Sequence, residues 1–189
     1  DAFKGKKTRS HSAALSDWIE GMGASAQFIA FSEVYTALER GILDCGVTGA
    51  DASHGQRWYE VTDYMIGPLI SWPFVNNVIN ADKWNSIPDD LKRILIEEAA
   101  KSELEALRIG SIQNEMGLIK NEAEGLEFIP FSAEMQEQSL NAAVMERVLP
   151  NWVKRVGDPT HPVITNIFNT KIGPLVDLKI ESDGSVTKK

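Results

Sequence analysis

The sequence is poor in the residues on which metal sites and covalent catalysis most often depend. Cys45 is its one cysteine, and the three histidines are His11, His54 and His161. One cysteine excludes an intrachain disulfide and any zinc site built on cysteines. The histidines lack metal-ligand spacing, and the sequence has neither a Gly-x-Ser-x-Gly nucleophile elbow nor a phosphate-binding loop. We therefore expect no catalytic residue, no bound metal and no cofactor.

Long apolar runs and an excess of positive charge are missing as well. No apolar run approaches the roughly 18 residues that a transmembrane helix needs, and no signal-peptide pattern opens the chain. Nineteen Lys and Arg stand against 27 Asp and Glu, a formal net charge of −8. Nucleic acids and anionic membranes bind basic faces, so the composition predicts no nucleic-acid partner and no direct membrane insertion. A single local arginine would still suffice for a small anion.

The most informative stretch runs from Gln27 to Asp51. Residues 27–31 form a short apolar run of the length of a buried strand. Ser32 stands at an N-cap position, and the residues after it repeat apolar side chains at helical spacing. Arg40 and Gly41 are typical of a helix end. A second strand is predicted to begin at Ile42 and to run into a glycine-containing loop.

A strand, a helix and a second strand joined by short connections predict a parallel sheet, and hence the α/β fold class. Ligands of parallel sheets gather at the carboxyl ends of the strands. The sequence therefore directs attention to the loop after Phe31 and to the loop after Asp44.

A long helix is predicted farther along the chain. Pro88, followed by Asp89 and Asp90, is a strong start signal, and the helical pattern continues to about Glu124. Such a helix is on the order of 50 Å long, which is more than the width of a small domain. It either spans two lobes or consists of two packed helices, and Gly110 is the expected bend.

Shorter elements are predicted around this helix. They are a strand at 6–10, a helix at 13–22, weak helix at 51–62, a strand at 126–131, a helix after Ser132, a helix at 158–172 and a terminal turn at 183–184.

Several separated motifs, in matching order, resemble the extracytoplasmic solute-binding proteins of tripartite ATP-independent periplasmic (TRAP) transporters, the DctP-type family. Phe31 to Cys45 follows the pattern Phe-Ser-Glu-Val-Tyr-x-Ala-Leu-x-x-Gly-x-x-Asp-Gly, and Gly5 to Arg9 follows Gly-x-Lys-x-Arg. The segments Trp58–Val61, Asn76–Asn80 and Trp84–Pro88 are similar to it too. The resemblance covers roughly residues 4 to 157.

The resemblance implies a periplasmic-binding-protein-like, two-lobe architecture with a long bridging helix, in which the N-terminal lobe segment is absent. Four regions are then expected. Residues 1–72 belong to the second, ligand-gripping lobe, and 73–124 form a hinge-crossing strand and the bridging helix. Residues 125–157 return to the second lobe, and 158–189 are a C-terminal helix and tail.

The function implied by the resemblance is transport. Such a protein captures a small organic acid in the periplasm and delivers it to the membrane subunits of a TRAP transporter, without catalysing a reaction. Two alternatives stay open from the residues alone. One is a ligand-binding sensor or an enzyme on the same scaffold, and the other is an incomplete fragment with no competent site.

Arg9 is the central candidate for ligand binding. By itself the sequence fits either a surface arginine or a fork that grips a carboxylate through two charge-assisted bonds. The resemblance favours the fork, because the arginine of this family motif is the carboxylate clamp. His11 and Ser12 follow at a helix start, where Ser12 either caps the helix or contacts the ligand. Phe31 packs either in the core or, as in the family, against the apolar part of the ligand.

The remaining candidates are Thr48, Gly49, Trp72 and Asn76. The family often carries an amide or acidic residue near Thr48, so this hydroxyl leaves the choice of ligand open. Trp72 and Asn76 are expected where the chain crosses between lobes, and Trp72 also suits a core position. Some relatives bind a carboxylate through a metal, but the expected ligand pattern is not present here.

Overall fold

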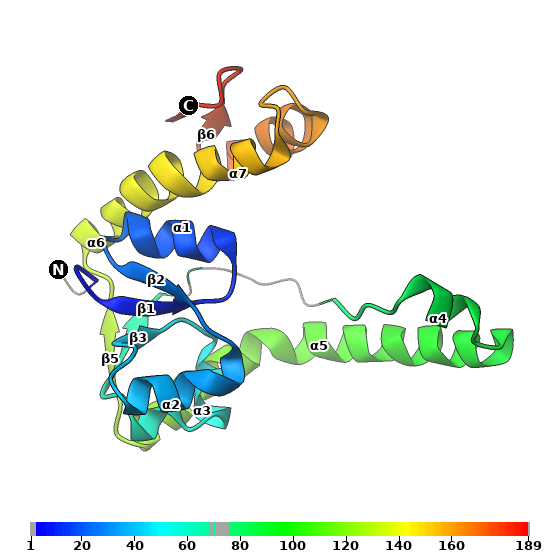
Figure 1. Cartoon of the computed structure of the whole chain (residues 1–189), viewed down its shortest axis with the longest axis horizontal. Coiled ribbons are helices and arrows are strands. Elements are labelled where there is room, and N and C mark those ends of the chain that lie inside the picture. Colours follow the sequence, from blue (N-terminus) through cyan, green and yellow to red (C-terminus); the bar gives the residue numbers. More distant parts are fainter. Residues whose placement is uncertain (1–2, 69, 71–75, 189) are drawn as a thin grey trace. The chain divides into compact units, whose positions relative to one another are not determined.

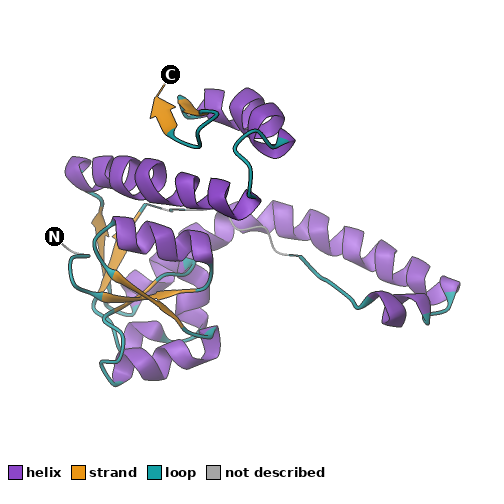
Figure 2. Cartoon of the chain, turned by 45° about the horizontal axis from the view of Figure 1, so that its top comes forward, coloured by secondary structure: helices purple, strands orange, loops and turns teal. Residues whose placement is uncertain are grey.

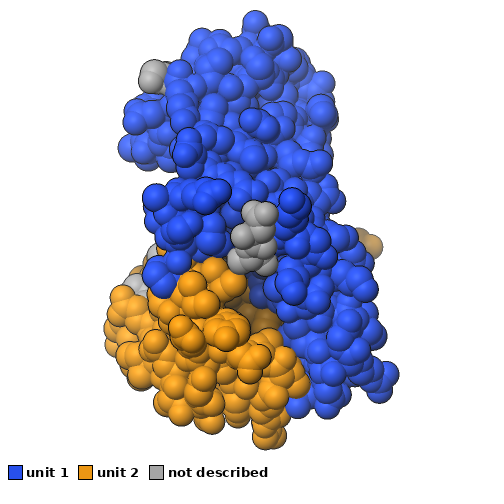
Figure 3. All heavy atoms as spheres, turned by 90° about the vertical axis from the view of Figure 1, so that its left-hand side faces the viewer, with its two compact units in different colours: residues 1–47, 130–189 blue, residues 48–129 orange. Residues whose placement is uncertain are grey.

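The computed structural model describes residues 3–68, 70 and 76–188, and its contacts divide the chain into two compact units. Unit 1 consists of residues 1–47 and 130–189, and unit 2 of residues 48–129 (Figure 3). Helices make up most of the regular structure, and the strands are short (Figure 2). The expected lobe boundaries at residues 72, 124 and 157 stay a prediction.

Unit 1 contains a parallel sheet in the order β2-β1-β3. Its strands are β1 (Lys7–Ser10), β2 (Ser25–Phe28) and β3 (Cys45–Gly46). Helix α1 (Ala13–Gly21) lies on one face and α2 (Val34–Glu39) on the other (Figure 1). The chain thus leaves β1 toward one face and β2 toward the other, which is the arrangement that opens a crevice between neighbouring strand ends. The predicted parallel sheet is confirmed.

Two strand limits differ from the prediction, each for a local reason. Strand β2 ends at Phe28 because its partner β1 ends at Ser10, the residue paired with Phe28. Strand β3 begins only at Cys45, because the N–H groups of Ile42 and Leu43 donate to the Ala37 carbonyl and close the end of α2. The prediction that Ile42 opens a strand is therefore wrong.

The predicted cap at Ser32 is also wrong. Phe31–Glu33 form a 3₁₀ turn, and Glu33 precedes α2 without any side-chain capping bond. The predicted apolar face of this helix is correct, since Val34, Ala37 and Leu38 are all buried.

The second segment of unit 1 packs on α1. Its helical stretches are α6 (Ala133–Gln138), a π-helical segment Ser139–Val148 and α7 (Leu149–Val156). Ser132 caps α6 as predicted, accepting from the Met135 N–H at 3.2 Å. Gly21 allows α1 to come close, because a Cβ there would lie 2.4 Å from the Ala143 Cα. The Trp18 indole donates to the Ser139 hydroxyl at 2.9 Å.

The end of unit 1 is a small cluster around a hairpin. A π-helical segment, Val163–Ile172, precedes the antiparallel strands β6 (Leu178–Ile180) and β7 (Val186–Lys188). The apolar cluster consists of Val153, Ile164, Phe168, Leu178 and Ile180. The predicted turn at 183–184 is confirmed, with Gly184 at a φ of +84°.

Unit 2 is dominated by α5 (Asp89–Ala123), which continues unbroken through Gly110 (Figure 1). One helix of 35 residues excludes the alternative of two packed helices. The other elements are α3 (Ala50–Gly55), β4 (Tyr64–Gly67), α4 (Ala81–Asn85) and β5 (Glu127–Pro130), with β4 paired to β5. Within the described ranges, no helix is both long enough and apolar enough to cross a membrane.

Candidate anion-binding site

Arg9 is buried in the central strand of the unit 1 sheet. Only 5% of its surface is exposed, which excludes the interpretation as an ordinary surface arginine. A buried charge needs hydrogen-bond partners, since removing it from water without them is very costly. The contacts of the guanidinium therefore decide what the residue does.

The Arg9 side chain joins the ends of all three strands. Its Nε donates to the carbonyl of Ile29, just after β2, at 3.1 Å. Its Nη1 donates to the carbonyl of Val47, just after β3, at 3.0 Å. The guanidinium is thereby fixed at the carboxyl edge of the sheet, where α/β proteins bind their ligands.

One side of this guanidinium makes no hydrogen bond to any described residue. Among the described residues, Nη2 has no hydrogen-bond acceptor. The guanidinium carbon lies 5.5 Å from the centroid of the half-buried Phe31 ring, within the range of a cation–π contact. Burial lowers the pKa of Arg9, but a guanidinium stays protonated in proteins. The result is a permanent, oriented positive charge beside an aromatic ring, with donors that no described residue accepts from.

A network of serines shapes the turn between β1 and α1. The buried Ser10 hydroxyl donates to the Ser12 carbonyl at 2.9 Å and lies 2.8 Å from the Ser16 hydroxyl. Ser12 caps α1 by accepting from the Leu15 N–H at 3.2 Å, which realises its predicted role as a cap. His11 is exposed in the same turn. Whether His11 and Ser12 touch a ligand stays a prediction.

The remaining predicted site residues lie in other parts of the chain. Thr48 is half-buried and Gly49 directly precedes α3, and both belong to unit 2. Asn76 is exposed, and Trp72 falls outside the described residues. The structure thus brings Arg9 and Phe31 into contact, while the ligand-binding roles of all eight predicted residues stay predictions.

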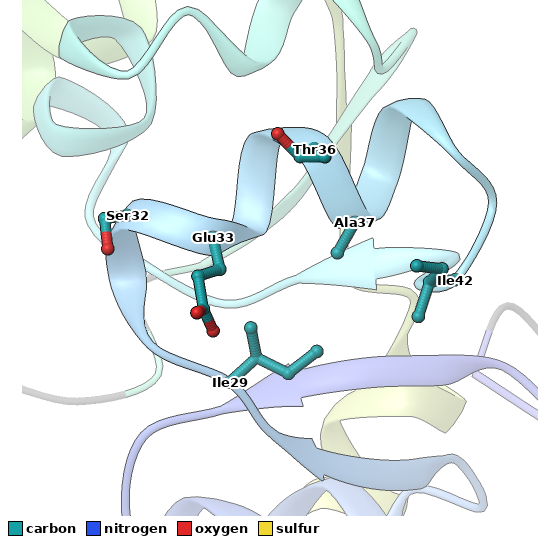
Figure 4. A pocket seen from close by; sticks show the side chains of 6 residues that line it. All are labelled: Ile29, Ser32, Glu33, Thr36, Ala37 and Ile42. Atoms are coloured by element: carbon teal, nitrogen blue, oxygen red, sulfur yellow. The ribbon is translucent and has the colours of Figure 1, made fainter.

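A pocket next to α2 does not suit an anion. It has a volume of about 380 Å³ and is lined by Ile29, Ser32, Glu33, Thr36, Ala37 and Ile42. Figure 4 shows the Glu33 carboxylate directed toward the Ile29 side chain. The lining carries a negative charge and no cation, so it would repel a carboxylate. The geometry favours Arg9 instead.

Sequence reasoning missed the carbonyl groups of Ile29 and Val47. Every residue has such a carbonyl, so no side-chain pattern could have indicated them. Within the described part of the chain, no group of three or more His, Cys, Asp or Glu side chains is arranged to hold a metal ion.

Comparison with known proteins identifies the family. Residues 1–153 match the family described as bacterial extracellular solute-binding protein, family 7, and the chain belongs to this family. The C4-dicarboxylate-binding periplasmic protein DctP of Rhodobacter capsulatus is 28% identical over 162 residues, covering 85% of this chain and 48% of that protein. A solute-binding protein of Roseobacter denitrificans is 24% identical over 152 residues, covering 78% and 43%. The chain spans about half the length of these curated relatives.

Solved structures confirm the fold. A TRAP periplasmic solute-binding protein from Desulfovibrio salexigens with bound orotic acid has a TM-score of 0.67 at 20% identity, covering 82% of this chain and 50% of that one. A Bordetella pertussis extracytoplasmic solute receptor binding pyroglutamic acid has a TM-score of 0.68 at 15% identity, with the same coverage. A malonate-bound protein from Rhodoferax ferrireducens gives 0.65 at 16%, covering 79% and 48%. The predicted α/β, periplasmic-binding-protein-like fold class is thus confirmed, and family members are solute-binding proteins rather than enzymes.

Proposed function

We propose that this chain captures a small organic acid anion in the periplasm for delivery to the membrane subunits of a TRAP transporter. The observation that carries the proposal is the buried Arg9 guanidinium, fixed by the carbonyls of Ile29 and Val47 with Nη2 unused among the described residues. Orotic acid, pyroglutamic acid and malonate, which the similar structures hold, all carry a carboxyl group.

The proposed binding mode follows from the geometry of Arg9. The unused edge of the guanidinium pairs with the ligand carboxylate, and hydrogen bonds to charged groups contribute about 1.5–3 kcal/mol each. Phe31 packs against the apolar part of the ligand. His11 and Ser12 line the β1–α1 turn, and closure of a second lobe would remove the bound anion from water.

The test compares Arg9→Lys with the parent chain by isothermal titration calorimetry against malonate, L-malate and pyroglutamate. Lysine keeps the charge but loses the planar fork and the two bonds to backbone carbonyls. We expect the affinity for the bound acid to fall about tenfold or more. The matched control is Arg40→Lys, which alters an exposed arginine at the end of α2 and is expected to leave binding unchanged.

Titrations are made below the melting temperature of both proteins, because Arg9→Lys also leaves the Ile29 and Val47 carbonyls without their donor. Equal affinity of parent and Arg9→Lys would refute the role of Arg9. Binding of no acid by the parent would favour the fragment interpretation. Conversion of a bound acid to a product would favour an enzyme.

A further inference from the structure

Helix α3 begins without a cap of its own. Its N-cap is Gly49, which has no side chain to accept a bond from the first turn. The acceptor comes from α5 instead, because the Ala50 N–H donates to the Asn114 Oδ1 at 3.3 Å. The side chain of one helix thus caps another helix that lies 64 residues away in sequence.

Asn121, about two turns farther along α5 than Asn114, holds the same turn. Its side chain is fully buried, and its Nδ2 donates to the carbonyls of Ala50 and Gly117, each at 2.8 Å. Both partners can only accept, which fixes the orientation of the amide group. The Nδ2 also lies 3.3 Å from the Ser53 hydroxyl.

Gly117 is what allows the two helices to meet this closely. A Cβ on Gly117 would lie 2.1 Å from the Asp51 nitrogen and 2.5 Å from the Ala50 carbonyl carbon, so no larger residue fits. The neighbouring Lys120 pairs with Asp51 at 2.9 Å. Asn114, Gly117 and Asn121 are spaced by three and four residues and so share one face of α5.

We propose that Asn114, Gly117 and Asn121 are positioning residues for a ligand-binding loop formed by Thr48 and Gly49. This loop directly follows Val47, whose carbonyl accepts a hydrogen bond from the Arg9 guanidinium at 3.0 Å. The inference rests on the proposed function. The clamped turn of α3 follows Thr48 and Gly49 directly, and the Gly49 carbonyl accepts from the Ser53 N–H at 3.0 Å. A loop held in its binding conformation loses less entropy when a ligand arrives, so the clamp raises affinity without touching the ligand.

Gly117→Ala tests the proposal, with Gly110→Ala as its matched control. Both changes add one methyl group to α5, but a Cβ at Gly110 meets nothing within 4 Å. Calorimetry with malonate, L-malate and pyroglutamate is expected to show about a tenfold weaker affinity for Gly117→Ala and no loss for Gly110→Ala. Hydrogen exchange of residues 48–55 should become faster in Gly117→Ala alone, with or without an acid present.

Asn114→Ala provides a milder variant in case Gly117→Ala does not fold. It removes only the acceptor for the Ala50 N–H, and we expect about a threefold loss of affinity with faster exchange at residues 48–55. Faster exchange with unchanged affinity in these variants would overturn the inference and leave the proposed function intact. Unchanged exchange would overturn it as well. If the parent itself binds no acid, the proposed function fails first, and the inference falls with it.

Discussion

Arg9 places a charge in the protein interior, where an apolar side chain would cost the fold less free energy. Removing a charge from water costs several kcal/mol even in real proteins, and well-packed apolar replacements of buried ionic groups are often neutral or stabilising. Two hydrogen bonds to carbonyls compensate this cost in part. The physical advantage of the guanidinium is therefore its direction, since its planar fork presents the remaining donors along a fixed line.

The aromatic ring of Phe31 is expected to contribute to the affinity for the bound acid. Phe31→Leu removes the aromatic face 5.5 Å from the Arg9 guanidinium, and we expect the affinity for the bound acid to fall by about three- to fivefold. The matched control is Phe28→Leu, because Phe28 is 76% exposed at the end of β2. Calorimetry that found both variants equal to the parent would remove Phe31 from the site.

The sequence predicted single residues well when the signal was local. Capping was one of the two roles expected of Ser12, because a serine before an apolar helical pattern bonds the next turn, and the structure shows this cap. The role of Gly117 could not be predicted in the same way. Gly110 and Gly117 look alike in the sequence, and only the tertiary contact with Asp51 distinguishes them. In the sequence, Asn114 and Asn121 likewise look like ordinary polar residues on the exposed side of a long helix.

Element limits were harder to predict than element types. The strand after Gln27 and the helix after it are both present, but β2 stops early because β1 offers no further partner beyond Ser10. The helix predicted from residue 51 begins at Ala50, and Asp51 lies inside its first turn and pairs with Lys120. In both cases a neighbour distant in sequence, rather than local propensity, decides where the element begins or ends.

The β6–β7 hairpin is expected to depend on pH. Asp183 accepts from the Ser185 N–H and hydroxyl at 2.9 and 2.6 Å, and these bonds hold its pKa below the ordinary value of 3.8. Hydrogen bonds from Lys179 and Thr187 likewise lower the pKa of Glu181. A lowered carboxyl pKa stabilises the fold above its ordinary value, and this contribution is lost as the pH falls through the lowered one.

Acidification from about pH 5 to pH 2 should therefore loosen residues 178–188, which NMR amide shifts can follow. Asp183→Asn keeps the shape of the turn without the charge and should lose part of this pH dependence. If the hairpin signals of parent and variant change identically over this range, Asp183 does not stabilise the turn through its charge.

At the scale of the whole chain, α5 presents an apolar surface that the described residues leave in contact with water. Several large apolar side chains of α5 are exposed, between 43% and 73%. One side of α5 carries Leu91, Ile94, Leu95, Ile112, Met116 and Ile119, because these positions share a face at 3.6 residues per turn. Leu104 and Leu107 lie on the opposite side. Contiguous apolar patches of this kind mark interaction surfaces or cause association. The sequence could not show that this stripe of six residues would be left uncovered in this chain.

This surface predicts how the 189-residue chain behaves alone. We expect it to self-associate as its concentration rises, because burying the stripe removes apolar area from water at about 25 cal/mol per Å². The double variant Ile94→Lys and Ile112→Lys places two charges on the stripe and should shift the chain toward monomer in sedimentation-velocity experiments. Ile96→Lys with Ala100→Lys adds the same charge on the opposite side of α5, where both residues are exposed, and should associate like the parent. A parent chain that stays monomeric at every concentration would contradict the prediction. If only the second double variant reduced association, the contact would lie on the opposite side of α5.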